Sequence, residues 1–284
     1  MKRIAFQGEL GAYSELAIYE YFGREVEVVP KPAFSDIFTA VASEKIDNGI
    51  IPIENSLTGS IHENYDLLLE HDLVITGEIK LRIVHNLIVK PGARLSDIKR
   101  VYSHPQALAQ CKDFLSQLEG AELISVYDTA GAAKRIKANR SCEEAAIASE
   151  QAAQDYELEI IKSGIESNHR NFTRFLILSK ELEVEAENSK TSIVFSTKNI
   201  PGALYKSLSV FDLRDIDLYK IESRPIAGTP WVYMFYLDFD GDIRHETTKR
   251  AISDLEEITS FLKFLGSYKK GDEVTTRTQE RNEA

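Results

Sequence analysis

The sequence predicts an α/β protein followed by a second, smaller domain. Over the first two thirds of the chain, short apolar segments alternate with segments of helical periodicity, which is typical of helices packed on largely parallel sheets. The apolar segments, such as 49–53, are short and nearly continuous, as expected for strands covered by helices on both faces. A charge-rich stretch, 179–190, then separates this region from a compact C-terminal pattern.

The elements of the first region are expected as strand–helix pairs. In chain order these are strand 2–6 and helix 12–22, strand 26–30 and helix 34–45, strand 49–53 and helix 61–71, an extended segment 74–89, strand 100–103 and helix 105–118, strand 123–126 and helix 129–139, and strand 145–148 with helix 149–155.

The C-terminal region has a different order of elements. We expect a strand at 191–197, a helix from 201 to about 213, strands at 217–226 and 231–240, a helix at 246–261 and a last strand at 264–268. Pro201 suits the first helical turn because the N–H that proline lacks has no helical partner there. This β-α-β-β-α-β order is that of ferredoxin-like domains. The residues from Lys270 onward are polar, and we expect no ordered structure there.

Composition and charge restrict the function. A length of 284 residues accommodates about two domains, and the net charge of −11 argues against nucleic acid as a partner. An anionic small molecule stays compatible where local dipoles and a few cations override that charge. No apolar run reaches the ~20 residues that cross a bilayer, and the chain enters a strand pattern at once, so we expect neither membrane partner nor signal peptide. Cys111 and Cys142 lack metal-type spacing, which favours buried thiols in a cytoplasmic protein.

Three strand–helix junctions are unusually polar. In the first, Gly8 and Gly11 precede the helix that carries Ser14; glycine lets a backbone approach a ligand closely, and the N–H groups of a helix start attract anions. The second follows strand 49–53 and places Asn55 and Ser56 among four polar groups, more than helix capping requires.

The third junction begins with Ser103 and His104 and has Pro105 at its helix start. His104 is either a helix cap or a catalytic base, and the cap is favoured because no neighbour in the sequence offers it a partner. Neither a dinucleotide fingerprint nor a phosphate-binding loop is present at these junctions.

A fourth polar segment, Asn171-Phe172-Thr173-Arg174-Phe175, stands where an apolar strand begins. Ligands of open α/β folds bind at the carboxyl ends of strands, so these segments are expected to form one site for a small molecule with several carboxylates. No nucleophile–base pair, metal cluster or cofactor loop accompanies them. The predicted chemistry therefore needs only positioning and a proton, with no metal and no cofactor.

Together these motifs resemble the prephenate dehydratase family, in its monofunctional bacterial type with a C-terminal ACT regulatory domain. The resemblance covers residues 1 to about 268 and rests on the segments Gly8-x-x-Gly11-Ala12-Tyr13-Ser14, Pro52-Ile53-Glu54-Asn55-Ser56, Ser103-His104-Pro105-Gln106-Ala107-Leu108, Asn171 to Phe175, Pro201-Gly202-Ala203-Leu204 and Ile221-Glu222-Ser223-Arg224-Pro225. It implies a catalytic domain at 1–180 with two lobes like type-II periplasmic binding proteins. The second lobe is expected at about 77–166, the ACT domain at 190–269 and a polar tail at 270–284.

The resemblance also implies an activity, the conversion of prephenate to phenylpyruvate, water and carbon dioxide in phenylalanine biosynthesis. Thr173 would donate its proton or a hydrogen bond to the departing ring hydroxyl. Arg174 would contact the anion or orient Thr173, and the two are not expected in one pocket unless the strand is irregular, because strand neighbours face opposite ways. The expected substrate contacts are Ser14, Asn55, Ser56, Ser103, Asn171 and Arg174.

For the ACT domain, the resemblance implies feedback regulation through an L-phenylalanine site. Its expected residues are Gly202, Ala203, Leu204, Glu222, Ser223, Arg224 and Pro225. Because ferredoxin-like units expose a sheet edge and ACT domains pair across it, we expect a homodimer or homotetramer. Phenylalanine bound at that interface would close the catalytic cleft or change its geometry.

Two alternatives stay open. The first is arogenate as the substrate, whose amino group replaces the keto oxygen of prephenate; an acidic residue such as Glu9 or Glu63 would recognise it. From a different class of function, the two-lobed region could be a non-enzymatic sensor of a small anion. Turnover that depends on the Thr173 hydroxyl separates the enzyme from the sensor.

Overall fold

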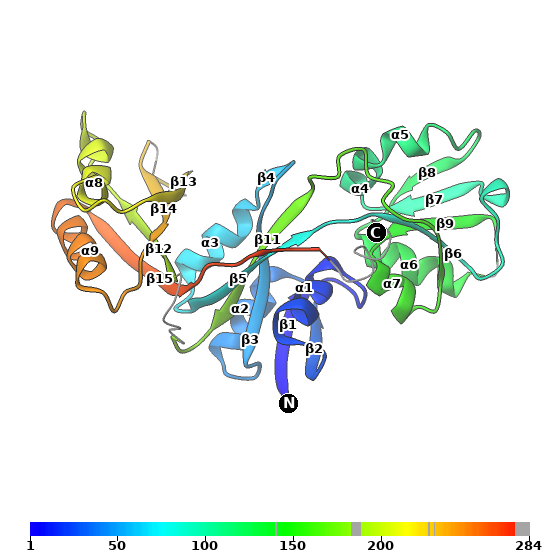
Figure 1. Ribbon diagram of the computed structural model, residues 1–284, viewed down its shortest axis with the longest axis horizontal. Coiled ribbons are helices and arrows are strands. Elements are labelled where there is room, and N and C mark those ends of the chain that lie inside the picture. The colour runs from blue at the N-terminus through cyan, green and yellow to red at the C-terminus, as the bar shows by residue number, and fades with distance from the viewer. Residues whose placement is uncertain (140, 183–188, 227, 230, 276–284) are drawn as a thin grey trace.

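The computed structural model describes residues 1–139, 141–182, 189–226, 228–229 and 231–275. Three sheets divide these residues into three bodies that lie in a row (Figure 1). We call them lobe 1, which holds the first strands and lies in the middle, lobe 2, which holds β6 to β10, and the C-terminal domain, which holds β12 to β15.

Lobe 1 is built on a seven-stranded mixed sheet of order β16-β5-β11-β3-β1-β2, with β4 paired to β3. Its elements are β1 (Lys2–Gln7), α1 (Tyr13–Phe22), β2 (Val26–Lys31), α2 (Phe34–Ala42), β3 (Asn48–Asn55), β4 (Gly59–Ser60), α3 (His62–Glu70), β5 (Val74–Arg82), β11 (Phe172–Ser179) and β16 (Glu273–Val274). Strand β1 runs parallel to β2 and β3, whereas β11 runs antiparallel between β3 and β5.

Lobe 2 repeats this plan on a five-stranded sheet of order β10-β6-β9-β7-β8. Its elements are β6 (Asn86–Val89), η1 (Leu95–Asp97), β7 (Arg100–Ser103), α4 (Pro105–Gln110), α5 (Lys112–Leu115), β8 (Glu122–Ser125), α6 (Thr129–Ala138), β9 (Glu144–Ala148), α7 (Glu150–Asp155) and β10 (Glu159–Lys162). In each lobe, three parallel strands stand beside an antiparallel strand that enters from the other lobe, β11 in lobe 1 and β6 in lobe 2. The expected two-lobed α/β architecture is confirmed.

The chain crosses between the lobes at 83–85 and returns at 163–171. The extended segment expected at 74–89 is therefore two strands, β5 and β6. The first crossing lies after residue 82, whereas the second lobe was expected to begin at about residue 77. The reason is the partner of β5: it pairs with β11 as far as Arg82, opposite Phe172, and so stays in lobe 1. The single helix expected at 105–118 is likewise two short helices, α4 and α5, that meet at Cys111.

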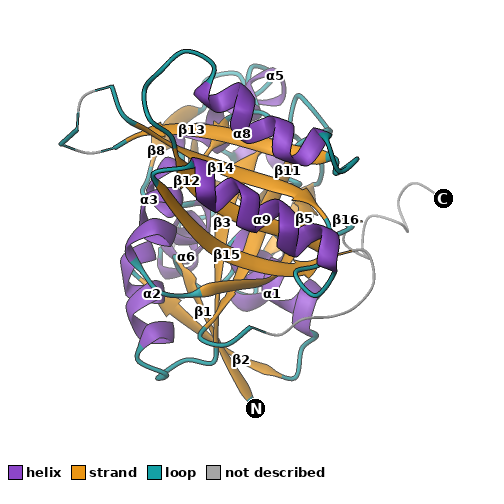
Figure 2. Cartoon of the chain, turned by 90° about the vertical axis from the view of Figure 1, so that its left-hand side faces the viewer, coloured by secondary structure: helices purple, strands orange, loops and turns teal. Residues whose placement is uncertain are grey.

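The C-terminal domain has the sheet order β13-β14-β12-β15 with antiparallel pairs throughout. Its elements are β12 (Ser189–Ser196), α8 (Ala203–Asp212), β13 (Leu218–Pro225), β14 (Tyr233–Asp240), α9 (Glu246–Ile258) and β15 (Phe261–Lys269). This is the ferredoxin-like topology expected from the sequence. Helices α8 and α9 cover one face of the sheet (Figure 2), where Phe195, Phe211 and Phe239 form the core.

The other face of this sheet packs directly on lobe 1. Val194, Tyr236 and Tyr268 share one hydrophobic core with Leu176 and Leu178 of β11. Side chains of β11 thus pack against the C-terminal domain, and this brings that domain into contact with the strand that carries Thr173.

The residues after Lys270 depart from the expectation of no ordered structure. Gly271 donates its backbone N–H to Glu78 Oε1 at 3.0 Å, and β16 pairs in parallel with β5, Glu273 opposite Lys80. The open edge of β5 offers unpaired backbone groups, and the two residues of β16 cover it. Residues 276–284 of the tail and 183–188 of the charge-rich stretch lie outside the described residues.

Across the described ranges, no helix has the length and apolar content that a membrane span requires. Both cysteines are free thiols. Cys111 is buried in the core of lobe 2, as expected, and burial raises its pKa. The expectation of burial is wrong for Cys142, which is exposed in the turn before β9.

The close packing of lobe 1 on the C-terminal domain generates a first prediction. A methyl group at Gly266 of β15 would lie 2.1 Å from the carbonyl oxygen of Ile75 in β5. Gly266→Ala should therefore lower the free energy of unfolding by about 3 kcal/mol or more, since neither backbone can move without breaking its sheet. The expected signature is faster hydrogen exchange in β5 and β15.

Gly92→Ala is the control, because Gly92 has a φ of +86° and nothing within 4 Å of an added methyl group. It should cost only the backbone strain, about 1–2 kcal/mol, without faster exchange in β5 or β15. Equal exchange in the two variants would show that Gly266 is not a contact point between the domains.

Candidate active site

A cavity of about 270 Å³ lies between lobes 1 and 2. Lobe 1 contributes Ser14, Asn55, Thr173 and Phe175 to its wall, and lobe 2 contributes His104, Gln106, Gln110 and Asp128. No Lys or Arg occurs among the described residues that line it. A bound anion would therefore be held by N–H and O–H dipoles and by histidine, without a permanent cation.

Strand β11 delivers Thr173 to this cavity and turns Arg174 away from it. Thr173 and Phe175 both line the cavity, whereas Arg174 does not. The strand pair is irregular here, but the extra residue is on β3: Arg174 pairs with Glu54 and Phe175 with Pro52, which leaves Ile53 unopposed. Alternation along β11 is therefore intact.

The Thr173 hydroxyl accepts a hydrogen bond whose direction the surrounding structure fixes. Asn55 Oδ1 accepts the backbone N–H groups of Leu57 and Thr58 at 3.0 and 3.1 Å, so the amide nitrogen of Asn55 points the other way. Asn55 Nδ2 donates to Thr173 Oγ1 at 3.0 Å. Because Oγ1 accepts this bond, the proton of Thr173 remains available to a ligand in the cavity.

A buried hydrogen-bonded chain continues behind Asn55 into lobe 2. Asn55 Nδ2 also donates to Asn171 Oδ1 at 2.7 Å, and Asn171 Nδ2 donates to Gln110 Oε1 at 3.2 Å. His85 Nε2 lies 2.7 Å from the same Gln110 oxygen, and His85 Nδ1 lies 2.8 Å from the Tyr13 hydroxyl. Burial lowers the pKa of His85 and so favours its neutral form.

This chain leaves one donor without a partner. Gln110 lines the cavity, and its Nε2 is buried with no hydrogen bond, since its oxygen takes both neighbouring donors. A buried unpaired donor at a cavity wall is where a ligand oxygen would bind. Asn171 itself is fully buried and does not line the cavity. It was expected to contact substrate, but in the structure it supports Asn55 instead.

The helix starts around the cavity differ in their caps. Helix α4 is capped by His104, whose Nδ1 accepts from Gln106 N at 3.2 Å, and α6 is capped by Asp128 through Gly131 N. Helix α1 begins after Ala12, which offers no side-chain cap. Glu15 N already donates to the carbonyl of Ala12 at 3.0 Å, so the N–H groups of Tyr13 and Ser14 are those available to an anion.

Two other expected contact residues have structural tasks. Ser56 accepts the N–H of Phe172 and donates to the carbonyl of Arg170, both at 2.9 Å, which fixes the returning crossover to lobe 1. Ser103 is fully buried and donates to the carbonyl of Ile147 at 2.7 Å. Neither lines the cavity, because each hydroxyl is bonded to backbone groups of a neighbouring segment that is remote in sequence.

The two lobes touch around the cavity. Glu9 of lobe 1 accepts from Lys134 and Tyr127 of lobe 2 at 2.8 and 2.9 Å, and the hydrogen bond from Lys134 lowers its pKa. Ser149 donates to the carbonyl of Gly11 at 2.6 Å, and a methyl group at Gly11 would lie 2.5 Å from Ala152 Cα. Only glycine permits this approach of α7 to the β1–α1 loop.

These contacts bear on the two acidic residues considered for an amino group. Glu9 is already paired with a cation, and Glu63 is exposed on α3 and does not line the cavity. The acidic residue that does line it is Asp128. Sequence reasoning missed Asp128, Gln110, His85 and Tyr13 as site residues. The Asp-Thr pair at the start of a helix was a usable signal for the first, but no local pattern distinguishes the other three.

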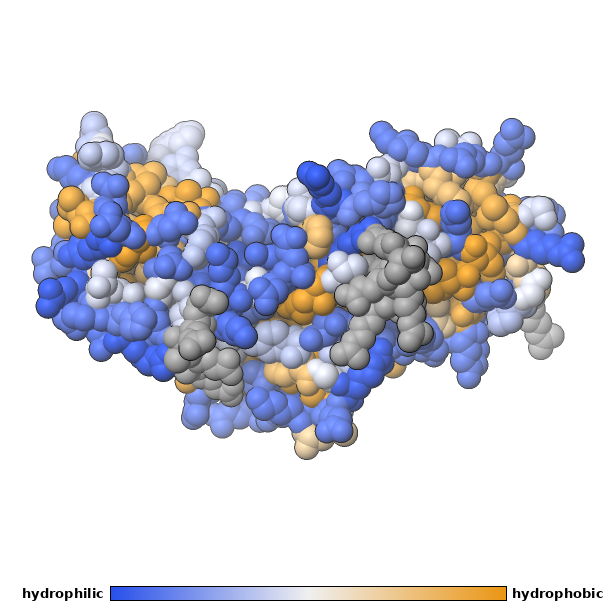
Figure 3. All heavy atoms as spheres, in the orientation of Figure 1, coloured by the Kyte–Doolittle hydropathy of each residue, from blue (hydrophilic) through white to orange (hydrophobic). Residues whose placement is uncertain are grey.

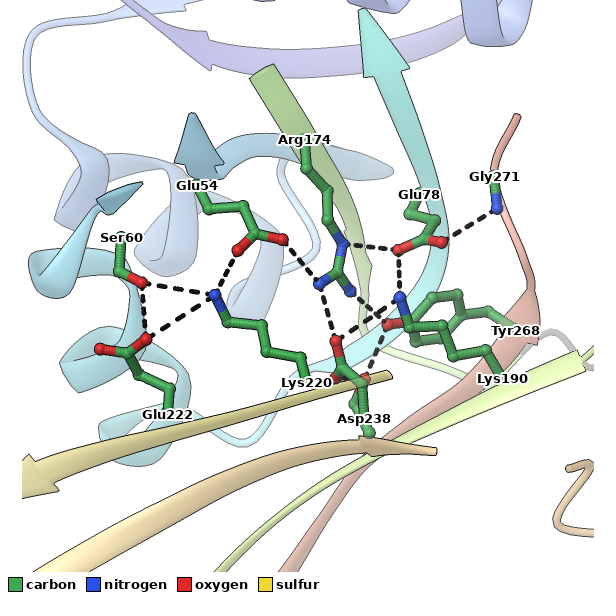
Figure 4. A network of polar contacts seen from close by, with 11 residues as sticks. Glu54, Ser60, Glu78, Arg174, Lys190, Lys220, Glu222, Asp238, Tyr268 and Gly271 are labelled. Atoms are coloured by element: carbon green, nitrogen blue, oxygen red, sulfur yellow. Dashed lines mark hydrogen bonds and ion pairs between the residues drawn. The ribbon is translucent and has the colours of Figure 1, made fainter. Parts of the chain in front are cut away.

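Arg174, on the opposite face of β11, joins lobe 1 to the C-terminal domain (Figure 4). Its guanidinium contacts Glu78 Oε2 at 2.6 Å, Asp238 Oδ2 at 2.7 Å and Glu54 Oε1 at 3.3 Å. Lys190 contacts the same Glu78 oxygen at 2.9 Å. The expected role of Arg174 as a substrate contact is therefore replaced by a position in an interdomain charge network, because strand alternation excludes it from the cavity.

Burial and charge oppose each other in this network, and charge prevails. Burial by itself raises the pKa of Asp238, but the charges of Arg174 and Lys190 and the hydrogen bond from Ser192 outweigh it and lower the pKa to about 2. Asp238 is therefore ionised at neutral pH. Removing one partner of such a buried network costs about 3–5 kcal/mol, because the remaining charges lose their compensation.

Residues expected in a phenylalanine site also lie at this interface. Glu222 accepts from Ser60 at 2.7 Å, and Arg224 contacts Asp66 at 2.6 Å, so both side chains engage lobe 1. Ser223 and Pro225 alternate with them on β13. Gly202, with a φ of +80°, precedes α8, which begins with Ala203 and Leu204.

Comparisons with known proteins agree with this architecture. The family model described as prephenate dehydratase matches residues 4–183. The Arabidopsis thaliana protein named arogenate dehydratase/prephenate dehydratase 2, chloroplastic, is 46% identical over 277 residues, which cover 94% of this chain and 72% of the relative.

Two solved structures extend the comparison. The prephenate dehydratase from Arthrobacter aurescens in complex with L-Phe has a TM-score of 0.86 at 29% identity, covering 94% of this chain and 90% of that one. A structure described as a novel type of quorum quenching acylase has a TM-score of 0.87 at 31% identity, covering 98% and 100%. On the family model and the identity to the curated relative, the chain belongs to the prephenate dehydratase family.

Proposed function

We propose that this chain converts prephenate to phenylpyruvate, water and carbon dioxide, under regulation by L-phenylalanine. The observation that carries the proposal is the Thr173 hydroxyl, which accepts from Asn55 and keeps its own proton for a ligand between the lobes. The family assignment supplies the substrate class, and the prephenate dehydratase with L-Phe bound supports the regulator.

Thr173 would act on the departing ring hydroxyl. The bond from the ring to its carboxylate carbon breaks, and its electron pair moves through the diene and expels the hydroxyl from the opposite carbon. The hydroxyl takes a proton and leaves as water. The Thr173 O–H donates to that oxygen, and the bond from Asn55 Nδ2 stabilises the negative charge that develops on Oγ1. Formation of an aromatic ring drives the step.

The absence of Lys and Arg from the described wall of the cavity suits loss of a carboxylate. No permanent cation holds the charge in place among the described lining residues, and Phe175, Ile83 and Pro52 add apolar surface. The side-chain carboxylate, which must stay bound, would take the uncapped start of α1 and Ser14. Gln110 Nε2 would bind a further substrate oxygen.

For regulation, we infer that the C-terminal domain is an ACT domain at 190–269 that acts on the catalytic region 1–180. The inference is supported by the interdomain network, which reaches the residues next to both Thr173 and Asn55. Arg174 follows Thr173, and Glu54 precedes Asn55. Arg174 and Glu54 form an ion pair with each other at 3.3 Å. A shift of the C-terminal domain would thus be felt on both sides of the catalytic hydrogen bond.

We place the L-phenylalanine site at the start of α8 and on β13, and propose a homodimer or homotetramer. Edge strand β13 pairs only with β14 within the described chain, and Ile200, Tyr205 and Ile221 are 57%, 77% and 44% exposed. Hydrophobic residues also reach the surface over this domain in Figure 3. A cytoplasmic location, which fits two free thiols, belongs to the same proposal.

The structural relative described as an acylase does not lead to a second candidate. Hydrolysis of an acyl amide needs a nucleophile activated by a base. The side chain hydrogen-bonded to Thr173 Oγ1 is the amide of Asn55, which donates a hydrogen bond and cannot act as a base. We therefore expect no turnover of an N-acyl amide.

Replacement of the Thr173 hydroxyl tests the enzyme. Thr173→Val keeps the shape of the side chain, and we expect kcat on prephenate to fall about 10²–10⁴-fold, while calorimetry still detects prephenate binding. Thr173→Ser keeps the hydroxyl and should retain most of the rate. Full activity of Thr173→Val would refute the role of the hydroxyl, and turnover of the N-acyl amide by the unaltered protein would favour the acylase activity.

Reversal of the Asn55 hydrogen bond tests the mechanism. In Asn55→Asp a carboxylate oxygen faces Oγ1 and captures the proton of Thr173, so kcat should fall as far as in Thr173→Val. The double variant should be no slower, because both changes remove the same donor. The control is Asn64→Asp, which should keep its kcat. Asn64 is also a buried asparagine, but its amide donates to the carbonyl of Pro52 and not to Thr173. Additive losses would separate Asn55 from Thr173.

The interdomain network predicts where regulation is transmitted. Asp238→Asn removes the charge shared by Arg174 and Lys190, so we expect the concentration of L-phenylalanine that halves activity to rise about fivefold or more. Asp240→Asn, on the same strand but bonded to Tyr219, is the matched control and should respond like the unaltered protein. Identical inhibition curves for all three proteins would exclude this route.

A further inference from the structure

Asp128 has a buried carboxylate oxygen that makes no hydrogen bond of standard geometry in the described structure. The residue lines the cavity at the start of α6, where its Oδ1 accepts the N–H of Gly131 and caps the helix. Its Oδ2 is buried and makes no hydrogen bond of standard geometry, although the backbone N–H of Glu9 lies near enough to lower the pKa of the carboxyl. Buried polar atoms almost always have a partner, so an exception at a cavity wall indicates a missing ligand group.

The surroundings of Asp128 do not supply the cation it lacks. Burial raises the pKa of its carboxyl, and the nearby carboxylate of Glu9 adds to that effect, while the N–H groups of Gly131 and Glu9 and the His104 ring oppose it. Lys134, on the same helix, is held by Glu9 at 2.8 Å. Gly8, opposite, leaves space: a methyl group there would lie 3.5 Å from Oδ2.

The cavity thus offers two complementary ends. The start of α1 presents N–H donors because Ala12 provides no cap, and this end suits a carboxylate. The start of α6 presents an acceptor because Asp128 occupies it. The two are near neighbours, since a methyl group at Gly8 would lie 3.5 Å from Asp128 Oδ2 and 3.6 Å from Ala12 Cβ. An α-amino acid carries a carboxylate and an ammonium group on one carbon and matches both. The keto oxygen of an α-keto acid has only lone pairs to offer to Oδ2, which repels it.

We propose that Asp128 is a specificity-determining residue that binds the ammonium group of arogenate and raises kcat/KM for arogenate relative to prephenate. The inference rests on the dehydratase function proposed above and adds the amino-acid form of the substrate to it. The reaction is unchanged at the ring: arogenate loses the same hydroxyl and carboxylate, and its ammonium group stays on the product, phenylalanine.

Asp128→Asn is the test, measured as kcat/KM on arogenate and on prephenate. Asparagine has the same shape and caps helices as well as aspartate, so the variant keeps the start of α6. Loss of one charge-assisted bond to the ammonium group should lower kcat/KM for arogenate about 10- to 100-fold, chiefly through KM. The value for prephenate should stay the same or rise, because the repulsion of its keto oxygen is relieved.

Glu9→Gln is the matched control, since it removes a neighbouring carboxylate that is already paired with Lys134. It should change both substrates alike and leave their ratio intact. An unchanged ratio in Asp128→Asn, or no arogenate turnover by the unaltered protein, would overturn the inference while prephenate turnover still upheld the proposed function. Failure of the unaltered protein on both substrates would overturn the function and the inference together.

Discussion

One pair of strands determines most of what this protein can do. Where β3 meets β11, Asn55 donates to Thr173 on the face toward lobe 2, and Glu54 pairs with Arg174 on the face toward the C-terminal domain. The two interactions involve neighbouring residues: Glu54 directly precedes Asn55 in β3, and Arg174 directly follows Thr173 in β11. An alternating strand can place a hydroxyl in a cavity and a guanidinium behind it only if the register is held, and the bulge at Ile53 takes up the extra residue without disturbing β11.

This arrangement keeps the cations of the domain interface apart from the cavity. The cavity receives amides, hydroxyls, helix starts and the carboxyl of Asp128. The cations Arg174 and Lys190 lie at the domain interface, where Glu78 and Asp238 compensate them. Neutral dipoles bind a carboxylate more weakly than a cation does. The negative charge can therefore leave the carboxylate when carbon dioxide is expelled. The same charges, buried and mutually compensated, make the position of the C-terminal domain specific, since any shift would leave one of them unpaired.

Asn55 shows why position in the structure matters more than residue type. Its amide has the groups to grip a carboxylate, but Leu57, Thr58, Asn171 and Thr173 take them all. Among the described residues that line the cavity, Gln110 and Asp128 of lobe 2 each have a buried polar atom without a hydrogen bond. Lobe 1 therefore orients the catalytic hydroxyl, and lobe 2 supplies the unpaired donor and acceptor that would read the substrate. Both sets meet only because contacts such as that of Glu9 with Lys134 hold the lobes together.

The sequence by itself determined the alternation of strands and helices, the ferredoxin-like order at the end of the chain, and the alternation that separates Thr173 from Arg174, because these follow from local periodicity. Its motifs also pointed to the family. Tertiary structure alone decided which polar residues reach the cavity: Ser56, Ser103 and Asn171 satisfy neighbours near in space but remote in sequence. It also decided that residues after Lys270 cover the edge of β5 and that Asp128 and Gln110 remain unpaired. Hydrogen-bond satisfaction is a property of the folded whole, and no local pattern encodes it.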